Sequence, residues 1–190
     1  MRSACVRVGL GLVLVASGAT AGHASTRVPG APRPYLDGPA GCVLPDPVRT
    51  SGCVTAPTDW LVLQVRNRFG DLPGACWDAH VWNPRSDHPR GRACDYTIGR
   101  IGAFPDRAQV AEGWRLARWL RTHARALHVH YVIFQGRIWS WERDAAGWRR
   151  YTGGGVYDPA DVTGGHYDHV HVSTVDRPPA EIFPAAATGP

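Results

Sequence analysis

The feature that most constrains the fold lies near the C-terminal end, where the chain reads GGHYDHVHVS. Histidine and valine alternate there, and side chains two residues apart on a β-strand project from the same face. Val170 and Val172 therefore belong on a hydrophobic core, with Asp168 on their side. His169 and His171 belong together on the opposite face. This alternation predicts a sheet with one packed face and one face that carries titratable groups.

The rest of the chain supplies further strands and a few helices. Residues 55–70 have the pattern of a helix, with Thr58 as its cap and Gly70 at its end. Residues 106–127 form the longest amphipathic pattern. Short runs with strand character stand at 76–83, 93–99, 128–134, 137–141 and 169–174. Few helices among several short strands, without a strand–helix–strand rhythm, predict a single α+β domain with a small, mostly antiparallel sheet flanked by helices.

Residues 1–24 have the layout of a secretory signal peptide. Arg2 and Arg7 precede a short apolar run, and small residues follow. Cleavage fits after Ala21 or Ala24. An uncleaved anchor is the alternative, although the run is too short to span a bilayer comfortably. We expect a secreted, soluble protein with no stable membrane anchor after cleavage.

Two segments rich in proline and glycine flank the folded unit. We expect a disordered leader at residues 25–41, a folded domain at 42–176 and a flexible tail at 177–190.

The basic residues are scattered along the chain. All 21 are arginines, and the formal charge of +5 falls to +3 when Arg2 and Arg7 are removed. Nucleic-acid binding usually requires a concentrated basic stripe, so we expect no nucleic-acid partner. Loose attraction to an anionic cell wall stays open. We expect a monomer.

Four cysteines follow the signal peptide: Cys42, Cys53, Cys76 and Cys94. An even count in an exported chain favours disulfides over a metal ribbon. Three pairings are possible. The pairs Cys42–Cys53 and Cys76–Cys94 close the shortest rings and would each contribute roughly 3 kcal/mol.

A candidate metal site combines the last strand with the stretch SDHPRGRACD. His88 lies in a loop there, Gly91 permits a sharp turn, and Asp95 enters a strand. With one histidine of the last strand, three nitrogen or oxygen ligands leave a position open for water, as in catalytic zinc sites. Because His169 and His171 share a face, one can bind metal while the other contacts the water or the reaction intermediate.

Both stretches resemble known peptidase motifs. SDHPRGRACD matches the S-x-H-x-x-G-x-A-x-D motif of the zinc D-Ala-D-Ala carboxypeptidases, and HYDHVH matches the H-x-x-H-x-H motif of the penicillin-insensitive murein endopeptidase. With the lysostaphin-type peptidases and the hedgehog signalling domain, these families share one α+β fold. The chain is similar, over roughly residues 42–175, to secreted bacterial proteins that carry such a domain.

The resemblance implies roles for individual residues. His88, Asp95 and His171 would be the ligands of Zn²⁺. His169 would be the catalytic histidine, with His166 beside it. The carboxypeptidases carry a glutamate three positions before the last ligand, where this chain has the shorter Asp168, a second candidate base.

These observations favour an exported zinc metallopeptidase, an endopeptidase or carboxypeptidase acting on peptides of cell-wall peptidoglycan. Arg85 and Arg92 are candidates to bind a substrate carboxylate. The alternative is a zinc-containing, non-catalytic module that binds cell wall or protein, which the missing glutamate supports. A metal-dependent phosphoesterase is disfavoured because a second acidic cluster is absent from the sequence.

The remaining histidines and two tryptophans have simpler interpretations. We expect ordinary surface or core positions for four histidines: His80, His123, His128 and His130. Trp139 and Trp141 fit a hydrophobic core better than a ligand cleft.

Overall fold

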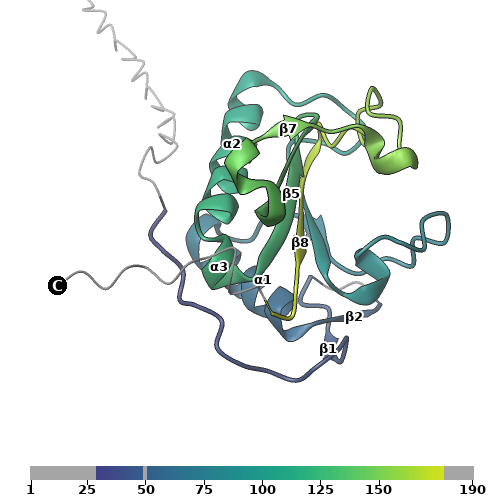
Figure 1. Cartoon of the computed structure of the whole chain (residues 1–190). Helices are drawn as coiled ribbons and strands as arrows, with labels where there is room; N and C mark the ends of the chain where they lie inside the picture. Colours follow the sequence, from purple (N-terminus) through teal and green to yellow (C-terminus); the bar gives the residue numbers. More distant parts are fainter. Residues whose placement is uncertain (1–28, 49–50, 178–190) are drawn as a thin grey trace, which may run out of the picture.

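The computed structural model describes residues 29–48 and 51–177 (Figure 1). The predicted signal peptide and residues 178–190 of the predicted tail lie outside the described residues. The main sheet is antiparallel, with the strand order β3-β4-β8-β5-β6-β7. Its strands are β3 (Gly74–Ala75), β4 (Ala93–Thr97), β5 (Val129–Phe134), β6 (Arg137–Ser140), β7 (Arg149–Arg150) and β8 (His169–Thr174). A separate hairpin pairs β1 (Leu44–Pro45) with β2 (Cys53–Val54).

Helices cover one face of this sheet (Figure 1). They are α1 (Ala56–Phe69), α2 (Arg107–Thr122) and α3 (Ala124–Leu127), with short 3₁₀ turns at His88–Arg90, Trp141–Ala146 and Gly153–Gly155. The described part of the chain contains no helix that combines the length and the apolar character needed to cross a membrane. The predicted α+β class, a single domain with a small antiparallel sheet, is confirmed.

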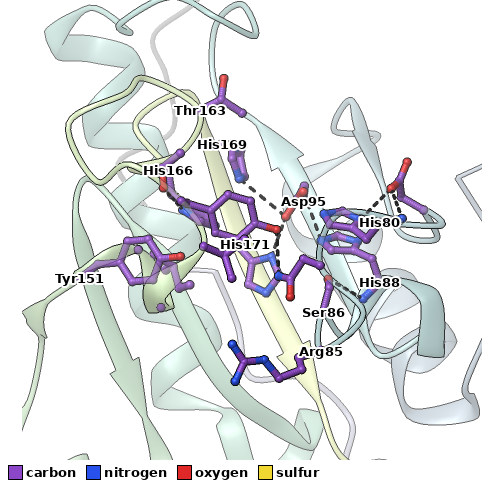
Figure 2. A pocket seen from close by; sticks show the side chains of 18 of the residues that line it. His80, Arg85, Ser86, His88, Asp95, Tyr151, Thr163, His166, His169 and His171 are labelled. Carbon is purple, nitrogen blue, oxygen red and sulfur yellow. Dashed lines mark hydrogen bonds and ion pairs between the residues drawn. The ribbon is translucent and has the colours of Figure 1, made fainter.

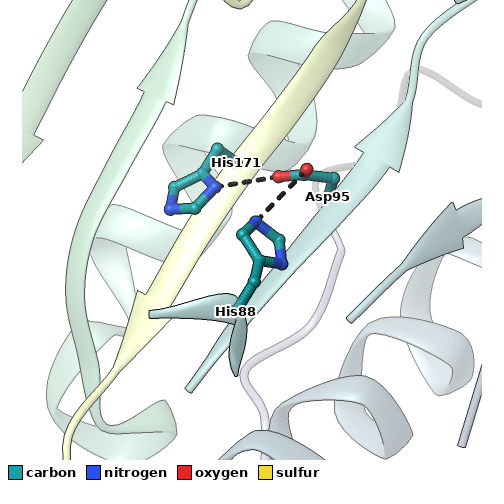
Figure 3. A group of neighbouring side chains, drawn as sticks. All are labelled: His88, Asp95 and His171. Atoms are coloured by element: carbon teal, nitrogen blue, oxygen red, sulfur yellow. Dashed lines mark hydrogen bonds and ion pairs between the residues drawn. The ribbon is translucent and has the colours of Figure 1, made fainter. Parts of the chain in front are cut away.

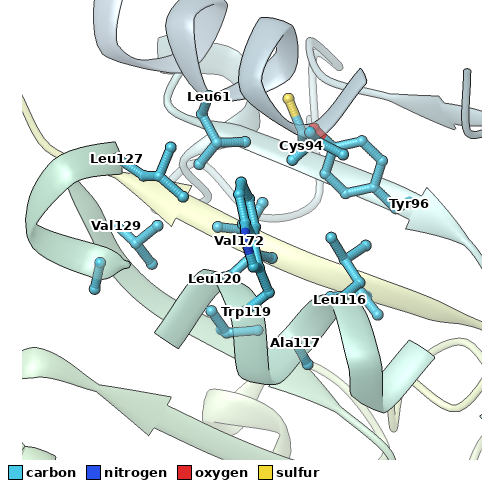
Figure 4. Packing of buried hydrophobic residues seen from close by; sticks show 14 of the residues in the cluster. Leu61, Cys94, Tyr96, Leu116, Ala117, Trp119, Leu120, Leu127, Val129 and Val172 are labelled. Carbon is cyan, nitrogen blue, oxygen red and sulfur yellow. The ribbon is translucent and has the colours of Figure 1, made fainter. Parts of the chain in front are cut away.

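The hydrophobic core lies between the helices and the sheet (Figure 4). Val170 and Val172 are almost fully buried in it, as their alternation predicted. Cys94 and Tyr96 of β4 belong to the same cluster, together with Leu120 of α2. The core therefore occupies one face of β4 and β8 and leaves the opposite face for other groups.

The helices differ in detail from the prediction. Thr55, not Thr58, stands at the N-terminus of α1, because Pro57 already occupies its first turn. Thr58 is buried instead, and its hydroxyl lies 2.7 Å from that of Thr174. The predicted helix at 106–127 is present, but it is interrupted at His123 between α2 and α3.

The predicted strand at 76–83 is wrong. In this part of the chain, the residues that pair with β4 are Gly74 and Ala75, which precede the predicted strand. After Ala75 the chain forms a local turn. The carboxylate of Asp78 accepts a hydrogen bond from the backbone N–H of His80 at 2.8 Å, and His80 has a φ of 43°. Such aspartate turns compete with sheet pairing, so these residues form a loop beside the sheet.

Both predicted disulfides, Cys42–Cys53 and Cys76–Cys94, are confirmed. The second joins the end of β3 to β4. Gly91 has a φ of 65°, and a side chain there would collide with Cys42 and with the backbone of Cys53. The predicted sharp turn is therefore also a point of close packing against the first disulfide.

Residues 29–41, the described part of the predicted leader, have no helix or strand, but they lie along the helices. Trp119 and Arg68 donate hydrogen bonds to the carbonyl of Gly30, and Trp60 donates to that of Arg33. This segment packs against the domain.

Candidate metal centre

Three side chains meet on the open face of the sheet (Figure 3). Asp95 lies in β4, directly opposite His171 in β8, and His88 comes from the 3₁₀ turn before β4. In an antiparallel pair, opposite residues have Cβ atoms about 4.5–5.5 Å apart, so the register alone brings Asp95 and His171 together. Gly91 then turns the chain so that His88 faces them.

The ligand atoms of this group converge. Nε2 of His88 lies 3.3 Å from Oδ2 of Asp95, and Nδ1 of His171 lies 2.8 Å from Oδ1. One atom from each of the three residues falls within 4.8 Å of the others. The group can hold a metal ion, as the sequence predicted.

Neighbouring groups aim the two imidazole rings. Nδ1 of His88 lies 2.6 Å from the carbonyl oxygen of Cys76, and a carbonyl can only accept, so we assign the proton to Nδ1. Nε2 of His171 lies 3.1 Å from the hydroxyl of Ser173, and here too we assign the proton to the ring nitrogen and the role of acceptor to the oxygen. Nε2 of His88 and Nδ1 of His171 are then free to bind a metal. Such outer partners are typical of metal-binding histidines.

The electrostatics of the group favour a cation. Burial opposes ionisation of Asp95, but His88 and His169 beside it hold the pKa of its carboxyl well below the usual range. Burial likewise lowers the pKa of His88, yet the Asp95 carboxylate outweighs this and raises it to about 9. Asp95 thus draws positive charge to the point where the ligand atoms meet, and a metal ion can replace the proton there.

His169 lies beside this group and is oriented by Asp168. Nδ1 of His169 donates to Oδ1 of Asp168 at 2.7 Å, which leaves Nε2 facing Asp95 at 3.8 Å. Both residues are buried. The second oxygen of Asp168 accepts from the N–H of Gly102 and the hydroxyl of Thr163, each at 2.7 Å. Burial opposes its ionisation, but the hydrogen bonds lower the pKa of Asp168 to about 2.

His166 completes the histidine cluster. Its ring lies 4.6 Å from that of His169 and 5.5 Å from that of His171, measured between centroids. Burial and these two histidines keep the pKa of His166 well below its usual range. His166 therefore stands in the site as a neutral ring, with Tyr151 packed edge-on against it at 5.0 Å.

A cleft of about 530 Å³ opens over these groups (Figure 2). One wall is the loop at 77–87, and the other is the glycine-rich segment at 151–166. The floor carries His88, Asp95 and His171. The cleft gives a ligand direct access to these three side chains, which we call the metal-capable group.

Of the two predicted carboxylate-binding arginines, the structure brings only one to the cleft. Arg85 lines it, and Figure 2 shows its side chain below the histidines. Arg92 pairs instead with Asp176 at 2.8 Å and is not among the described residues that line the cleft. Arg92 stands between His88 and Asp95 in the sequence, but its side chain points elsewhere, because it lies one position off the period of the face that carries Asp95.

Several cleft residues were not predicted. His80, expected at an ordinary position, lines the cleft and stacks on His88. Tyr131 of β5 stacks on His171, with centroids 5.3 Å apart, and donates to Asp87 at 3.1 Å. Tyr131 reaches this face because the register of β5 shifts between Val129 and Tyr131. By contrast, Trp139 and Trp141 are buried in the core, as expected.

Comparison with known families gives one match. The family model described as VldE, C-terminal domain, matches residues 50–166, more than half of the chain. The matched segment contains His88 and Asp95 and ends at His166, before β8. No curated protein and no solved structure matches the chain.

Proposed function

The chain belongs to the VldE C-terminal domain family, and we propose that it is an exported zinc metallopeptidase that hydrolyses peptide bonds in cell-wall peptidoglycan. The observation that carries the proposal is the convergence of His88, Asp95 and His171 at the floor of an open cleft. Two histidines and a carboxylate are a ligand set of catalytic zinc sites, which keep one position for water. The peptidase motifs that the sequence resembles place the same three residues in this role.

The residues present fit a zinc ion. They would hold it through Nε2 of His88, a carboxylate oxygen of Asp95 and Nδ1 of His171, the atoms that their other partners leave free. When bound, zinc lowers the pKa of a water molecule and polarises a carbonyl group.

His169 is the residue that we propose moves the proton. Hydrolysis adds one water across the peptide bond: the C–N bond breaks, the water oxygen stays on the new carboxylate, and a proton goes to the leaving amine. Asp168 fixes the proton on Nδ1 of His169, so Nε2 carries the lone pair that accepts a proton from water and returns it to the amine. Asp168 positions His169 and does not itself face the ligands.

The pairing of His169 with Asp168 favours a catalytic role over a zinc-containing binding module. A module that only binds needs no buried carboxylate to orient a histidine next to the metal ligands. Neutral His166 and the cation Arg85 would contact the substrate from either side of the cleft. The two disulfides are typical of proteins outside the cytoplasm, which supports export to the cell wall.

The test is digestion of purified peptidoglycan by zinc-loaded protein, followed by mass spectrometry of the soluble products. We expect peptide fragments with a new amine and a new carboxylate, and none with the His171→Ala variant. Fragments formed equally by that variant would exclude a metal-dependent reaction at this site. Sedimentation with the polymer but no fragments from the wild type would support the binding module instead.

A further inference from the structure

A stack of aromatic rings leads from the metal-capable group to the surface. The rings of His88 and His80 lie parallel, with centroids 4.7 Å apart and planes at 4° (Figure 2). The ring of His80 in turn contacts Trp82, with centroids 4.8 Å apart and planes at 37°. Trp82 lines the cleft, yet it is 62% exposed, and Val81 beside it is 83% exposed.

The loop that carries Trp82 is held in place, although it has no regular secondary structure. The backbone N–H of Asn83 donates to the carbonyl of His80 at 2.7 Å. The side-chain amide of Asn83 donates to the hydroxyl of Tyr157, on the opposite wall of the cleft, at 3.1 Å. Trp82 is therefore an exposed indole fixed at the mouth of the cleft.

An exposed apolar surface with polar groups at its rim is typical of a ligand-binding groove, and Trp82 provides such a surface at the cleft. The polar groups that line the cleft together with Trp82 indicate what kind of ligand would bind there. The amide of Asn83, the hydroxyl of Tyr157 and the carboxylate of Asp78 lie on the same cleft walls. A ligand that fits both features has a flat apolar face with hydroxyl or amide groups at its edge. A saccharide ring has this construction.

We infer that Trp82, supported by His80, is a subsite for a saccharide ring of the glycan to which the substrate peptide is attached. The identity of the polymer rests on the proposed function, but the subsite itself does not require turnover. Through His80 and His88, the ring stack fixes the position of the sugar relative to the metal-capable group. The subsite would therefore help to place the attached peptide over His169 and the ligands.

The test measures binding of a soluble β-1,4-linked tetramer of N-acetylglucosamine to the full chain, by calorimetry or by quenching of tryptophan fluorescence. We expect saturable binding by the wild type and at least about tenfold weaker binding by Trp82→Ala. Trp82→Tyr should lose less, because it keeps an aromatic face. Phe104→Ala is the matched control, since Phe104 is also 65% exposed but is not among the described cleft residues.

A metal-site variant separates this inference from the proposed function. Asp95→Ala should bind the tetramer like the wild type, even if it digests nothing, since Asp95 is not part of the ring stack. The inference is overturned if the wild type does not bind the tetramer, if Trp82→Ala binds as tightly, or if Phe104→Ala weakens binding equally. Loss of binding in Asp95→Ala would place the sugar at the metal-capable group instead.

Discussion

The two faces of strand β8, which is six residues long, differ in their surroundings. On one face, Val170 and Val172 are almost fully buried in a core that the helices and the sheet build together. On the other, His169 and His171 face a cleft and meet Asp95 from the neighbouring strand. The valines pack the strand against the rest of the molecule, and the histidines carry the chemistry that we propose. The comparison teaches that changes on one face should cost stability and changes on the other should cost function.

The largest effect is expected at a metal ligand. His171→Ala removes one of three ligands, so the protein should lose its stoichiometric zinc and all detectable peptide release. Val172→Ala, the adjacent residue on the opposite face, should keep both. Metal analysis of the purified variants makes the comparison. A wild-type protein without stoichiometric zinc, or a His171→Ala protein that keeps it, would contradict the assignment.

The next effect concerns the pair beside the ligands. His169→Ala removes the proposed acid and base, so kcat should fall by roughly 10²–10⁴-fold with zinc retained. Asp168→Asn can still accept from Nδ1 of His169, so it should lose clearly less, about 10–100-fold. Steady-state kinetics at matched zinc content measure both. The reverse ranking would mean that Asp168 acts directly, as the glutamate of the carboxypeptidases does.

The Cys76–Cys94 disulfide connects the two faces. Cys94 belongs to the core face of β4, while the carbonyl of Cys76 orients His88 on the other side. Replacing both cysteines by alanine should lower the free energy of unfolding by about 2–5 kcal/mol and weaken zinc binding roughly tenfold. Urea titration and a competitive chelator measure the two effects. Replacing Cys42 and Cys53 is the control, which should reduce stability with a smaller effect on zinc.

Much of this arrangement follows from the sequence, because it depends on local periods. The alternation in β8 assigned its histidines and valines to opposite faces, and short rings selected both disulfides. The three candidate ligands, His88, Asp95 and His171, stood in recognisable motifs. These features depend on local backbone geometry and sequence spacing, and not on how distant segments pack together.

The parts that could not be predicted depend on contacts between distant segments. Residues 76–83 alternate like a strand, but the turn at Asp78 removes them from the sheet, and only then does His80 reach His88. The irregular register of β5 brings Tyr131 to the site face, which no simple period predicts. The sequence placed Asp168 away from the ligands, and it is indeed their neighbour only through His169.

On the core face, Val172→Ala should lower the free energy of unfolding by roughly 2 kcal/mol, because it leaves a small cavity in a tightly packed cluster. The value of kcat per folded molecule should stay unchanged. Urea titration and kinetics below the unfolding transition check the two statements. A fall in kcat without a change in zinc content would show that the two faces are coupled.

The smallest effects are expected at Arg85 and Arg92. Comparing them tests whether an arginine must line the cleft to affect substrate binding. Arg85 lines the cleft, so Arg85→Ala should raise KM for a carboxylate-bearing peptide by up to roughly tenfold and leave kcat unchanged. Arg92 forms a partly exposed pair with Asp176, which contributes about 0–1 kcal/mol to stability, and Arg92→Ala should alter neither constant. Equal increases in KM for both variants would indicate a general effect of positive charge on an anionic polymer. That result would shift substrate recognition from a defined contact in the cleft to the field of the whole surface.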